Sequence, residues 1–275
     1  MHLRHPNLRT NLLIPCFVCL LAGCNDLFDV HPYDMHLHGA RDLNNVYIKN
    51  IQETCQGKDT LRIAFISDTH GWYTQLEDEI HDINQRDSID FVIHCGDLTD
   101  TGTTKEYKWI RDYLNRLNKP YIAVVGNHDF LGTGDEAYDW MFGKKDFSFI
   151  INRLKIVCLD TNAMEYDRMA AVPDFNFIEN EANNNNDSLF DRTILIMHAP
   201  PYSDEFNNNV SKVFGYYLTL FPGLMFCVYG HEHEDKTMYI YDNVPPFYGI
   251  DCVAHRNYKI FTVKPDGYEV SRIDF

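Results

Sequence analysis

The sequence predicts an α/β protein in which two β-sheets pack against each other and helices cover them. Strand-like and helix-like segments alternate between residues 61 and 125, and the final third of the chain is rich in strand-like segments. The 275 residues suit one large domain and leave little room for a second core. Apolar residues make up 45% of the chain, which favours a packed globule over a disordered chain.

Three strands and two helices alternate in the first half of the chain. We expect strands at residues 61–67, 90–95 and 121–125, because each segment is a short apolar run. Amphipathic helices are expected between them, at residues 72–86 and 104–117. This order predicts parallel neighbouring strands joined by helical crossovers, with functional residues beyond the carboxyl ends of the strands.

The pattern of the second half is mainly that of β-strands. A hairpin is predicted at residues 147–160, with its turn at Asn152 and Arg153. The Asn-rich segment 179–192 predicts a helix end and a surface loop. Further strands are expected at residues 193–197, 224–229, 237–241, 258–263 and 268–273.

Residues 1–23 have the pattern of a secretory signal peptide. Arg4 and Arg9 precede an apolar run that is too short to span a bilayer. The run ends in "LAGC", residues 21–24, which resembles the lipobox of bacterial lipoproteins. The resemblance implies a lipid on Cys24 and an exported protein that is anchored to a membrane of the cell envelope, facing the periplasm or the outer surface. An ordinary signal peptide followed by a chance cysteine is the alternative.

Residues 24–59 are predicted to be a polar tether that leads into the domain, and residues 60–275 the folded domain. The tether prediction rests on the segment 31–45, which has neither the helical nor the strand period.

The net charge and the cysteine spacing argue against two kinds of site. The chain has 40 acidic and 24 basic residues and a formal net charge of -16, so a nucleic-acid backbone would be repelled and general nucleic-acid binding is not expected. No CxxC pair exists outside the signal region, so a zinc site built from thiolates is not indicated.

Five of the expected strands end in aspartate, histidine or asparagine. Such side chains are oxygen and nitrogen donors, which suit zinc, manganese or divalent iron. The set is too large for one ion, and it suffices for two divalent ions that share one carboxylate. The residues are Asp68, His70, Asp97, Asn127, His128, Asp129, His198, His231 and His233.

The stretches that contain these residues resemble the motif series of the calcineurin-like metallophosphoesterases. The stretches are "DTH", "GDLTD", "GNHD", "MHAPP" and "GHEH", in that order, and the resemblance covers about residues 60–275. It implies a four-layer α/β/β/α sandwich of two mixed β-sheets. Each short motif is weak alone, but five in series at expected strand ends indicate the family strongly.

The resemblance also implies a role for each residue. Seven are implied as ligands of two metal ions: Asp68, His70 and His233 for one, Asn127, His198 and His231 for the other, and Asp97 between them. His128 is implied to face the phosphoryl oxygen or the leaving group, and Asp129 to orient His128. Asp100 is a candidate partner that supports the ligands.

The implied activity is hydrolysis of a phosphodiester or phosphomonoester by a hydroxide that bridges the two ions, with His128 as general acid. The substrate would be a phosphorylated small molecule or a component of the envelope. The alternative is a surface lipoprotein that binds without catalysis and whose metal site is structural or a relic. The complete set of ligand positions and the presence of His128 favour catalysis.

Four further residues carry weaker signals. Trp72 and Tyr73 could stack on a ring of the substrate, but the start of a helix against the core explains them equally well. Arg256 could bind phosphate, although a surface strand would also carry it. His94 is expected to point away from the strand-end cluster, because side chains alternate along a strand.

Overall fold

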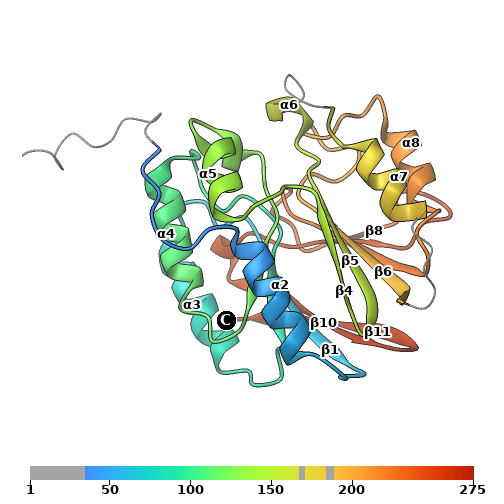
Figure 1. Ribbon diagram of the computed structural model, residues 1–275, viewed down its shortest axis with the longest axis horizontal. Helices are drawn as coiled ribbons and strands as arrows, with labels where there is room; N and C mark the ends of the chain where they lie inside the picture. Colours follow the sequence, from blue (N-terminus) through green and yellow to red (C-terminus); the bar gives the residue numbers. More distant parts are fainter. Residues whose placement is uncertain (1–34, 167–170, 184–188) are drawn as a thin grey trace, which may run out of the picture.

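The computed structural model describes residues 35–166, 171–183 and 189–275 (Figure 1). The predicted signal peptide and Cys24 lie outside the described residues. Within the described ranges, no helix has both the length and the apolar character that a membrane span requires.

The first sheet is mixed. Within the described chain it contains β1 (Leu61–Ile66), β2 (Phe91–His94), β3 (Tyr121–Ala123), β10 (Asn257–Lys264) and β11 (Gly267–Asp274). Their order across the sheet is β11, β10, β1, β2, β3. β1, β2 and β3 pair in parallel, as the predicted βαβαβ order requires, whereas β10 pairs antiparallel with both β1 and β11.

The second sheet is also mixed. In the part of the chain that the structure describes, its strands are β4 (Phe147–Ile151), β5 (Arg153–Leu159), β6 (Phe190–Met197), β7 (Leu224–Tyr229), β8 (Thr237–Met238) and β9 (Phe247–Gly249). Their order is β4, β5, β6, β7, β9, β8. β5, β6, β7 and β9 are parallel, so their carboxyl ends lie along one edge of the sheet.

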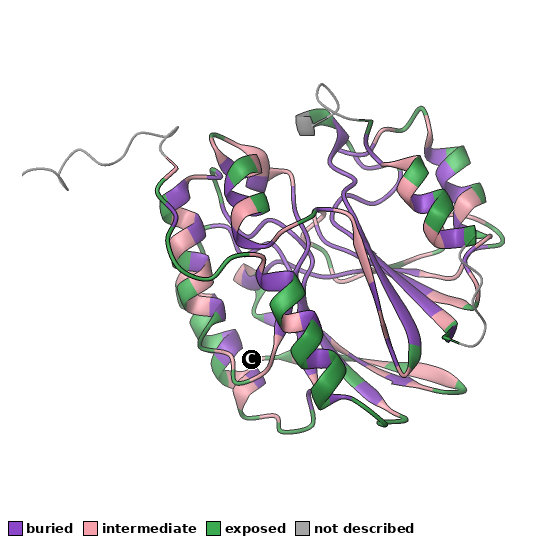
Figure 2. Cartoon of the chain, in the orientation of Figure 1, coloured by how far each residue is buried: buried purple, intermediate pink, exposed green. Residues whose placement is uncertain are grey.

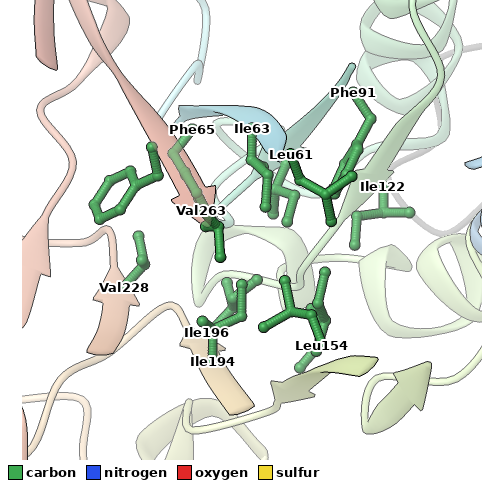
Figure 3. Packing of buried hydrophobic residues seen from close by; sticks show 14 of the residues in the cluster. Leu61, Ile63, Phe65, Phe91, Ile122, Leu154, Ile194, Ile196, Val228 and Val263 are labelled. Carbon is green, nitrogen blue, oxygen red and sulfur yellow. The ribbon is translucent and has the colours of Figure 1, made fainter. Parts of the chain in front are cut away.

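A hydrophobic core separates the two sheets. In β1, the alternate residues Leu61, Ile63 and Phe65 belong to the cluster that also contains Leu154 and Ile196 of the second sheet (Figure 3). Ala64 and Ile66 of the same strand belong to a different cluster, under the helices. Because side chains alternate along a strand, one face of β1 packs against the second sheet and the other face packs against the helices.

Helices cover the outer faces of both sheets (Figure 1). α3 (Tyr73–Asn84), α4 (Thr104–Leu114) and α5 (Gly134–Met141) pack on the first sheet, and α7 (Phe175–Asn183) and α8 (Ser211–Leu218) on the second. Figure 2 shows the strands mainly buried and the outer faces of the helices exposed. The layers therefore confirm the predicted α/β/β/α sandwich. The described chain also contains the short helices α6 (Ala163–Tyr166), η1 (His128–Phe130) and η2 (Val253–His255).

Local sequence explains where several elements begin or turn. Thr103 and Glu106 form a capping box at the start of α4, in which each side chain bonds the backbone N–H of the other. Asn152 and Arg153 turn the hairpin between β4 and β5 with positive φ angles of 45° and 70°, which suits a two-residue turn.

The tether prediction is wrong for the residues next to the domain. α2 (Leu43–Thr54) forms there, and its Ile48 and Ile51 are buried in the core between the sheets. The side-chain amide of Asn44 bonds both the N–H and the C=O of Ala123 at 2.9 Å, and Gln52 donates to the Ile150 carbonyl at 3.0 Å. α2 therefore binds the two edge strands β3 and β4, and closes one side of the sandwich.

The strand expected at residues 237–241 is also shorter than predicted. β8 ends at Met238, and the side chain of the next residue, Tyr239, is 78% exposed. β9 was not expected, because it has only three residues and follows two prolines directly. Short strands of this kind form through their neighbours, here β7 and β8, and carry little pattern of their own.

Substitution of Ile51 tests whether α2 is part of the folded domain. Ile51→Ala should lower the free energy of unfolding by about 2–5 kcal/mol, because it leaves a cavity in the core between the sheets. Urea unfolding measures the loss. Val46→Ala is the matched control in the same helix, since Val46 is 52% exposed, and it should change stability little. Equal stability of the two variants would mean that α2 is a detachable segment.

Candidate metal centre

The predicted donor residues of both sheets meet at one edge of the sandwich. They follow β1, β2 and β3 of the first sheet and β6 and β7 of the second. One half of the cluster contains Asp68, His70 and His233. His233 Nε2 lies 3.1 Å from Asp68 Oδ1 and 3.3 Å from His70 Nε2, and His70 Nε2 lies 4.0 Å from the same aspartate oxygen.

The other half contains Asn127, His198 and His231. Asn127 Oδ1 lies 3.0 Å from His198 Nε2 and 3.2 Å from His231 Nδ1. His198 Nδ1 lies 2.9 Å from the carbonyl oxygen of Cys95, which can only accept, so Nδ1 donates and Nε2 faces the cluster.

Asp97 lies between the two halves. Its Oδ2 is 3.5 Å from His70 Nε2 and 3.2 Å from His198 Nε2, and its Oδ1 accepts a hydrogen bond from the backbone N–H of His128 at 2.9 Å. Asp97 is 2% exposed, so this carboxylate is nearly shielded from water. A single buried carboxylate thus contacts histidines from both sheets.

The backbone around the donors is strained. Asp68, His70, Asp97, His231 and His233 all have positive φ angles, between 44° and 68°. Residues other than glycine seldom adopt this conformation, and each one costs about 1–3 kcal/mol. The rest of the fold therefore has to hold these five residues in place.

Two glycines let the strand-end loops approach each other closely. A Cβ on Gly126 would lie 2.1 Å from the backbone nitrogen of Asp97, and a Cβ on Gly230 would lie 2.2 Å from Ser67 Oγ. Any side chain at either position would push the loops apart. Both glycines directly precede a donor, Asn127 or His231, so this close approach sets the distances within the cluster.

The donor set fits metal ions. When both rings are neutral, the lone pairs of His198 Nε2 and His231 Nδ1 face Asn127 Oδ1, because the other nitrogen of each ring donates to an oxygen. Three acceptors that converge in this way are suited to a positive charge between them. Asp68 belongs to two groups of carboxylate and imidazole donors, one with His70 and His233 and the other with Asp97 and His198. Within each group the ligand atoms lie within 4.8 Å of one another. The residues present therefore fit cations bound to nitrogen and oxygen.

Protons supply this positive charge when no metal is bound. Burial lowers the pKa of His198, but the charge of Asp97, the hydrogen bond to it and the charge of Asp68 together outweigh burial and raise that pKa to about 9. The hydrogen bond to Asp68 raises the pKa of His233 to about 10. Burial alone would raise the pKa of Asp97, yet His198 and the neighbouring histidines hold it below its usual range. The buried carboxylates thus depend on cationic partners.

His128 lies beside the cluster. Its Nδ1 donates to the backbone carbonyl of Asp100 at 2.7 Å, and its ring packs edge-on against His70, with ring centres 4.6 Å apart. His128 and Asp100 line a cavity of about 450 Å³ together with His70, His233 and Trp72. Because Nδ1 is bound to a carbonyl, Nε2 is the ring nitrogen left for a ligand.

Asp129 does not orient His128, which corrects the prediction from the sequence. Its buried carboxylate accepts hydrogen bonds from the backbone N–H groups of Leu98, Thr99 and Gly126 at 3.2, 2.9 and 2.9 Å. Burial and the charge of Asp97 raise its pKa to about 7. Asp129 therefore joins the loop after β2 to the loop after β3.

Asp100 supports the site through its backbone. Its carboxylate Oδ1 is 3.6 Å from His70 Nδ1, too far for a hydrogen bond, whereas its carbonyl holds His128. No residue of the described chain makes a hydrogen bond to His70 Nδ1, although this atom is buried.

The three weaker candidates occupy different surroundings. Trp72 lines the cavity beside His128 and is 48% exposed. Tyr73 stacks on Tyr113 with ring centres 5.2 Å apart, and so packs between α3 and α4. Arg256 pairs with Asp78 at 2.8 Å and donates to the carbonyl of Phe275, which places its guanidinium at the chain terminus and α3. Of these three, only Trp72 lines the cavity.

Sequence reasoning missed two residues that contact the site. His94 is fully buried and, contrary to expectation, bonds the loop that carries two donors: its Nε2 lies 2.8 Å from Oγ1 of Thr69, the residue between Asp68 and His70. Asp204 Oδ1 lies 2.8 Å from His231 Nε2. His94 has a signal in hindsight, a polar residue inside a buried strand, whereas Asp204 lies in a loop without any pattern.

Known proteins are similar to this chain in sequence and in fold. The chain is 34% identical over 88 residues to a probable glycerophosphodiester phosphodiesterase of Arcobacter nitrofigilis, an alignment that covers 30% of this chain and only 32% of that protein. It is 24% identical over 222 residues to a probable cyclic nucleotide phosphodiesterase of Fibrobacter succinogenes, covering 69% of this chain and 82% of that protein. A dimetal phosphatase from Danio rerio has a similar fold, with a TM-score of 0.58, 12% identity, and coverage of 78% of this chain and 99% of that chain.

A family model described as calcineurin-like phosphoesterase matches residues 61–235. This range exceeds half of the chain and contains all the clustered donors and His128. The chain therefore belongs to the calcineurin-like phosphoesterase family, which is named for the hydrolysis of phosphate esters.

Proposed function

We propose that this protein is a phosphoester hydrolase that works with two divalent metal ions. The observation that carries the proposal is the position of Asp97, a buried carboxylate in contact with one histidine of each half of the donor cluster. One cluster of donors that is divided by a shared carboxylate suits a pair of cations.

Seven residues would hold the two ions. Asp68, His70 and His233 form the first group, Asn127, His198 and His231 the second, and Asp97 would contact both ions. Manganese, iron and zinc all suit these nitrogen and oxygen donors. Such ions, once bound, would neutralise the charge of a phosphate and lower the pKa of a water molecule so that it can act as a nucleophile at neutral pH.

His128 would protonate the leaving group. A carbonyl oxygen only accepts, so Nδ1 of His128 keeps its proton whether the ring is neutral or charged. The proton that is exchanged is therefore carried by Nε2. The backbone N–H of His128 donates a hydrogen bond to Asp97, and this bond fixes the position of His128 relative to the metal ligands.

The substrate would be a phosphorylated small molecule or envelope component that fits the cavity beside His128. The names of the relatives from Arcobacter and Fibrobacter favour a phosphodiester. Trp72 offers an exposed aromatic face in the cavity for a flat or apolar group of that substrate. The loop 201–209, which carries Asp204 beside His231, would set part of the remaining specificity.

We further propose that the protein acts at a membrane surface of the cell envelope. The basis is the signal peptide pattern and the lipobox-like sequence before Cys24. Two or more acyl chains on one residue suffice for stable anchoring.

Metal removal tests the proposed activity. The purified protein should hydrolyse a chromogenic phosphodiester or monoester with added Mn²⁺, lose this activity after chelation, and regain it when Mn²⁺ is returned. Asp97→Asn should not regain it, because the two ions would lose the carboxylate that they share. Absence of turnover with Mn²⁺, Zn²⁺ and Fe²⁺ would favour a protein that binds without catalysis.

Removal of the His128 imidazole should impair catalysis and spare metal binding. His128→Ala should reduce kcat by about 10²- to 10⁴-fold, because the leaving group would depart without a proton donor. Calorimetric titration with Mn²⁺ should give the same affinity as for the unsubstituted protein. His81→Ala, at an exposed histidine of α3, is the control and should leave both values unchanged. Full activity of His128→Ala would exclude the role in proton transfer.

Metal affinity should rise with pH. In the metal-free protein His198 and His233 have pKa values raised to about 9 and about 10, so each carries a proton that a metal ion must displace. The dissociation constant for Mn²⁺ should fall about tenfold per pH unit for each displaced proton, between about pH 6.5 and 9. Calorimetry in buffers of different ionisation enthalpy counts the released protons.

The same pKa shifts fix the sign of the stability change. His198 and His233 have pKa values that folding raises, so they stabilise the folded state fully at pH values below the ordinary histidine pKa of 6.5. This contribution disappears as the pH rises through their pKa values in the folded protein. The metal-free protein should therefore lose stability between about pH 6.5 and 10, whereas the Mn²⁺-loaded protein should not. An affinity for Mn²⁺ that is independent of pH would contradict the proposed ligands.

A further inference from the structure

Asp204 contacts the outer nitrogen of His231. It lies in the loop that follows β6, with its Oδ1 2.8 Å from His231 Nε2. The side chain of Asp204 is 85% exposed, whereas that of His231 is 14% exposed. An ionised carboxylate only accepts hydrogen bonds, so His231 donates from Nε2. The hydrogen bond from His231 also lowers the pKa of Asp204, which keeps this carboxylate ionised.

This contact decides which nitrogen of His231 faces the donor cluster. A neutral imidazole carries one proton, and with that proton on Nε2 the lone pair is on Nδ1. Nδ1 is the atom that lies 3.2 Å from Asn127 Oδ1. The opposite tautomer would point an N–H into the position where a cation belongs, and would exclude the cation.

The loop that carries Asp204 is held in place by its own side chains. Asn208 Oδ1 accepts from the backbone N–H of Tyr202 at 2.8 Å, and Asn208 Nδ2 donates to the carbonyl of Ser203 at 2.7 Å. Ser203 Oγ donates to the carbonyl of Pro200 at 2.8 Å. The two residues directly before Asp204 are thus fixed, and Asp204 is presented to His231 at a defined position.

The two histidines on this side of the cluster are oriented in different ways. His198 is held by the carbonyl of Cys95, a backbone group in the fully buried core. His231 is held by an exposed side chain on a loop. Loss of Asp204 would therefore release the His231 ring without disturbing the core, which makes the contribution of this contact measurable.

We propose that Asp204 is a positioning residue that fixes the tautomer and ring orientation of His231 for metal binding. This inference rests on the proposed function, since it assigns His231 Nδ1 to a metal ion. Partners of this kind, which contact a ligand and not the metal, typically contribute 10- to 100-fold to metal affinity.

Two variants of Asp204 and one control test the proposal. Asp204→Ala removes the acceptor, and Asp204→Asn keeps an oxygen that accepts from Nε2 but removes the charge. Glu234→Gln is the control for charge, because Glu234 lines one cavity of about 440 Å³ together with Asp204 and His231. Among the described residues Glu234 pairs with Lys236 and makes no hydrogen bond or ion pair with His231. Both positions have exposed side chains, so thermal unfolding should show that all three variants are folded.

Two measurements are needed, one of them without metal. Calorimetry with Mn²⁺ should show affinity reduced about 10- to 100-fold in Asp204→Ala, reduced less in Asp204→Asn, and unchanged in Glu234→Gln. In the metal-free protein near pH 8, ¹H–¹⁵N spectra of labelled histidine should show His231 protonated on Nε2. This tautomer should persist in Asp204→Asn and be partly replaced in Asp204→Ala. The signals of His231 are identified by their loss in His231→Gln.

The outcomes separate this inference from the proposed function. If the unsubstituted protein binds no Mn²⁺, the metal centre is refuted, and the tautomer measurement still decides whether Asp204 orients His231. If Mn²⁺ binds and Asp204→Ala changes neither affinity nor tautomer, the role of Asp204 is refuted and the metal centre stands. An equal loss of affinity in Glu234→Gln and Asp204→Ala would also refute it, because general charge would then explain the effect.

Discussion

The burial of the Asp97 carboxylate is the constraint on which the site depends. An ionised carboxylate that is removed from water is costly unless positive charge surrounds it. Here His198 from the second sheet provides that charge as a proton in the metal-free protein. His70 from the first sheet contacts the same carboxylate, although burial lowers the pKa of His70. The two sheets are therefore joined at this edge by electrostatics as well as by the hydrophobic core. Metal ions would replace the protons without changing the need for positive charge.

The strained backbone near Asp97 follows from the same requirement. Parallel strands end side by side, but their loops must bend sharply for donors from five strands to converge within a few ångströms. The five donor residues with positive φ provide these bends, and Gly126 and Gly230 provide the space. A site that is held in this way needs little rearrangement when a ligand arrives, because the fold has already ordered the donors.

The sequence allowed the sandwich and the cluster to be predicted for a general reason. Side chains such as Asp68 and His231 follow strands directly, and the carboxyl ends of parallel strands share an edge, so their proximity does not depend on details of packing. The role of Asp129 could not be predicted, because it depends on which N–H groups lie nearest to its carboxylate in space. Asp204 lies in an irregular loop, and only the folded structure brings it to His231. α2 was not predicted because the polar residues before and at its start show no helical period. Its buried residues are recognised only from their contacts with the core and with β3.

The contacts of α2 have a consequence for solubility. A strand at the edge of a sheet offers unpaired backbone groups that can recruit a strand from another molecule. The Asn44 amide occupies such groups on β3, and Gln52 occupies one on β4. The helix lies outside the region that matches the family, residues 61–235. A protein shortened only on the N-terminal side of that region would lack α2 and expose both edges, and it would self-associate edge to edge even where its catalytic residues remained intact.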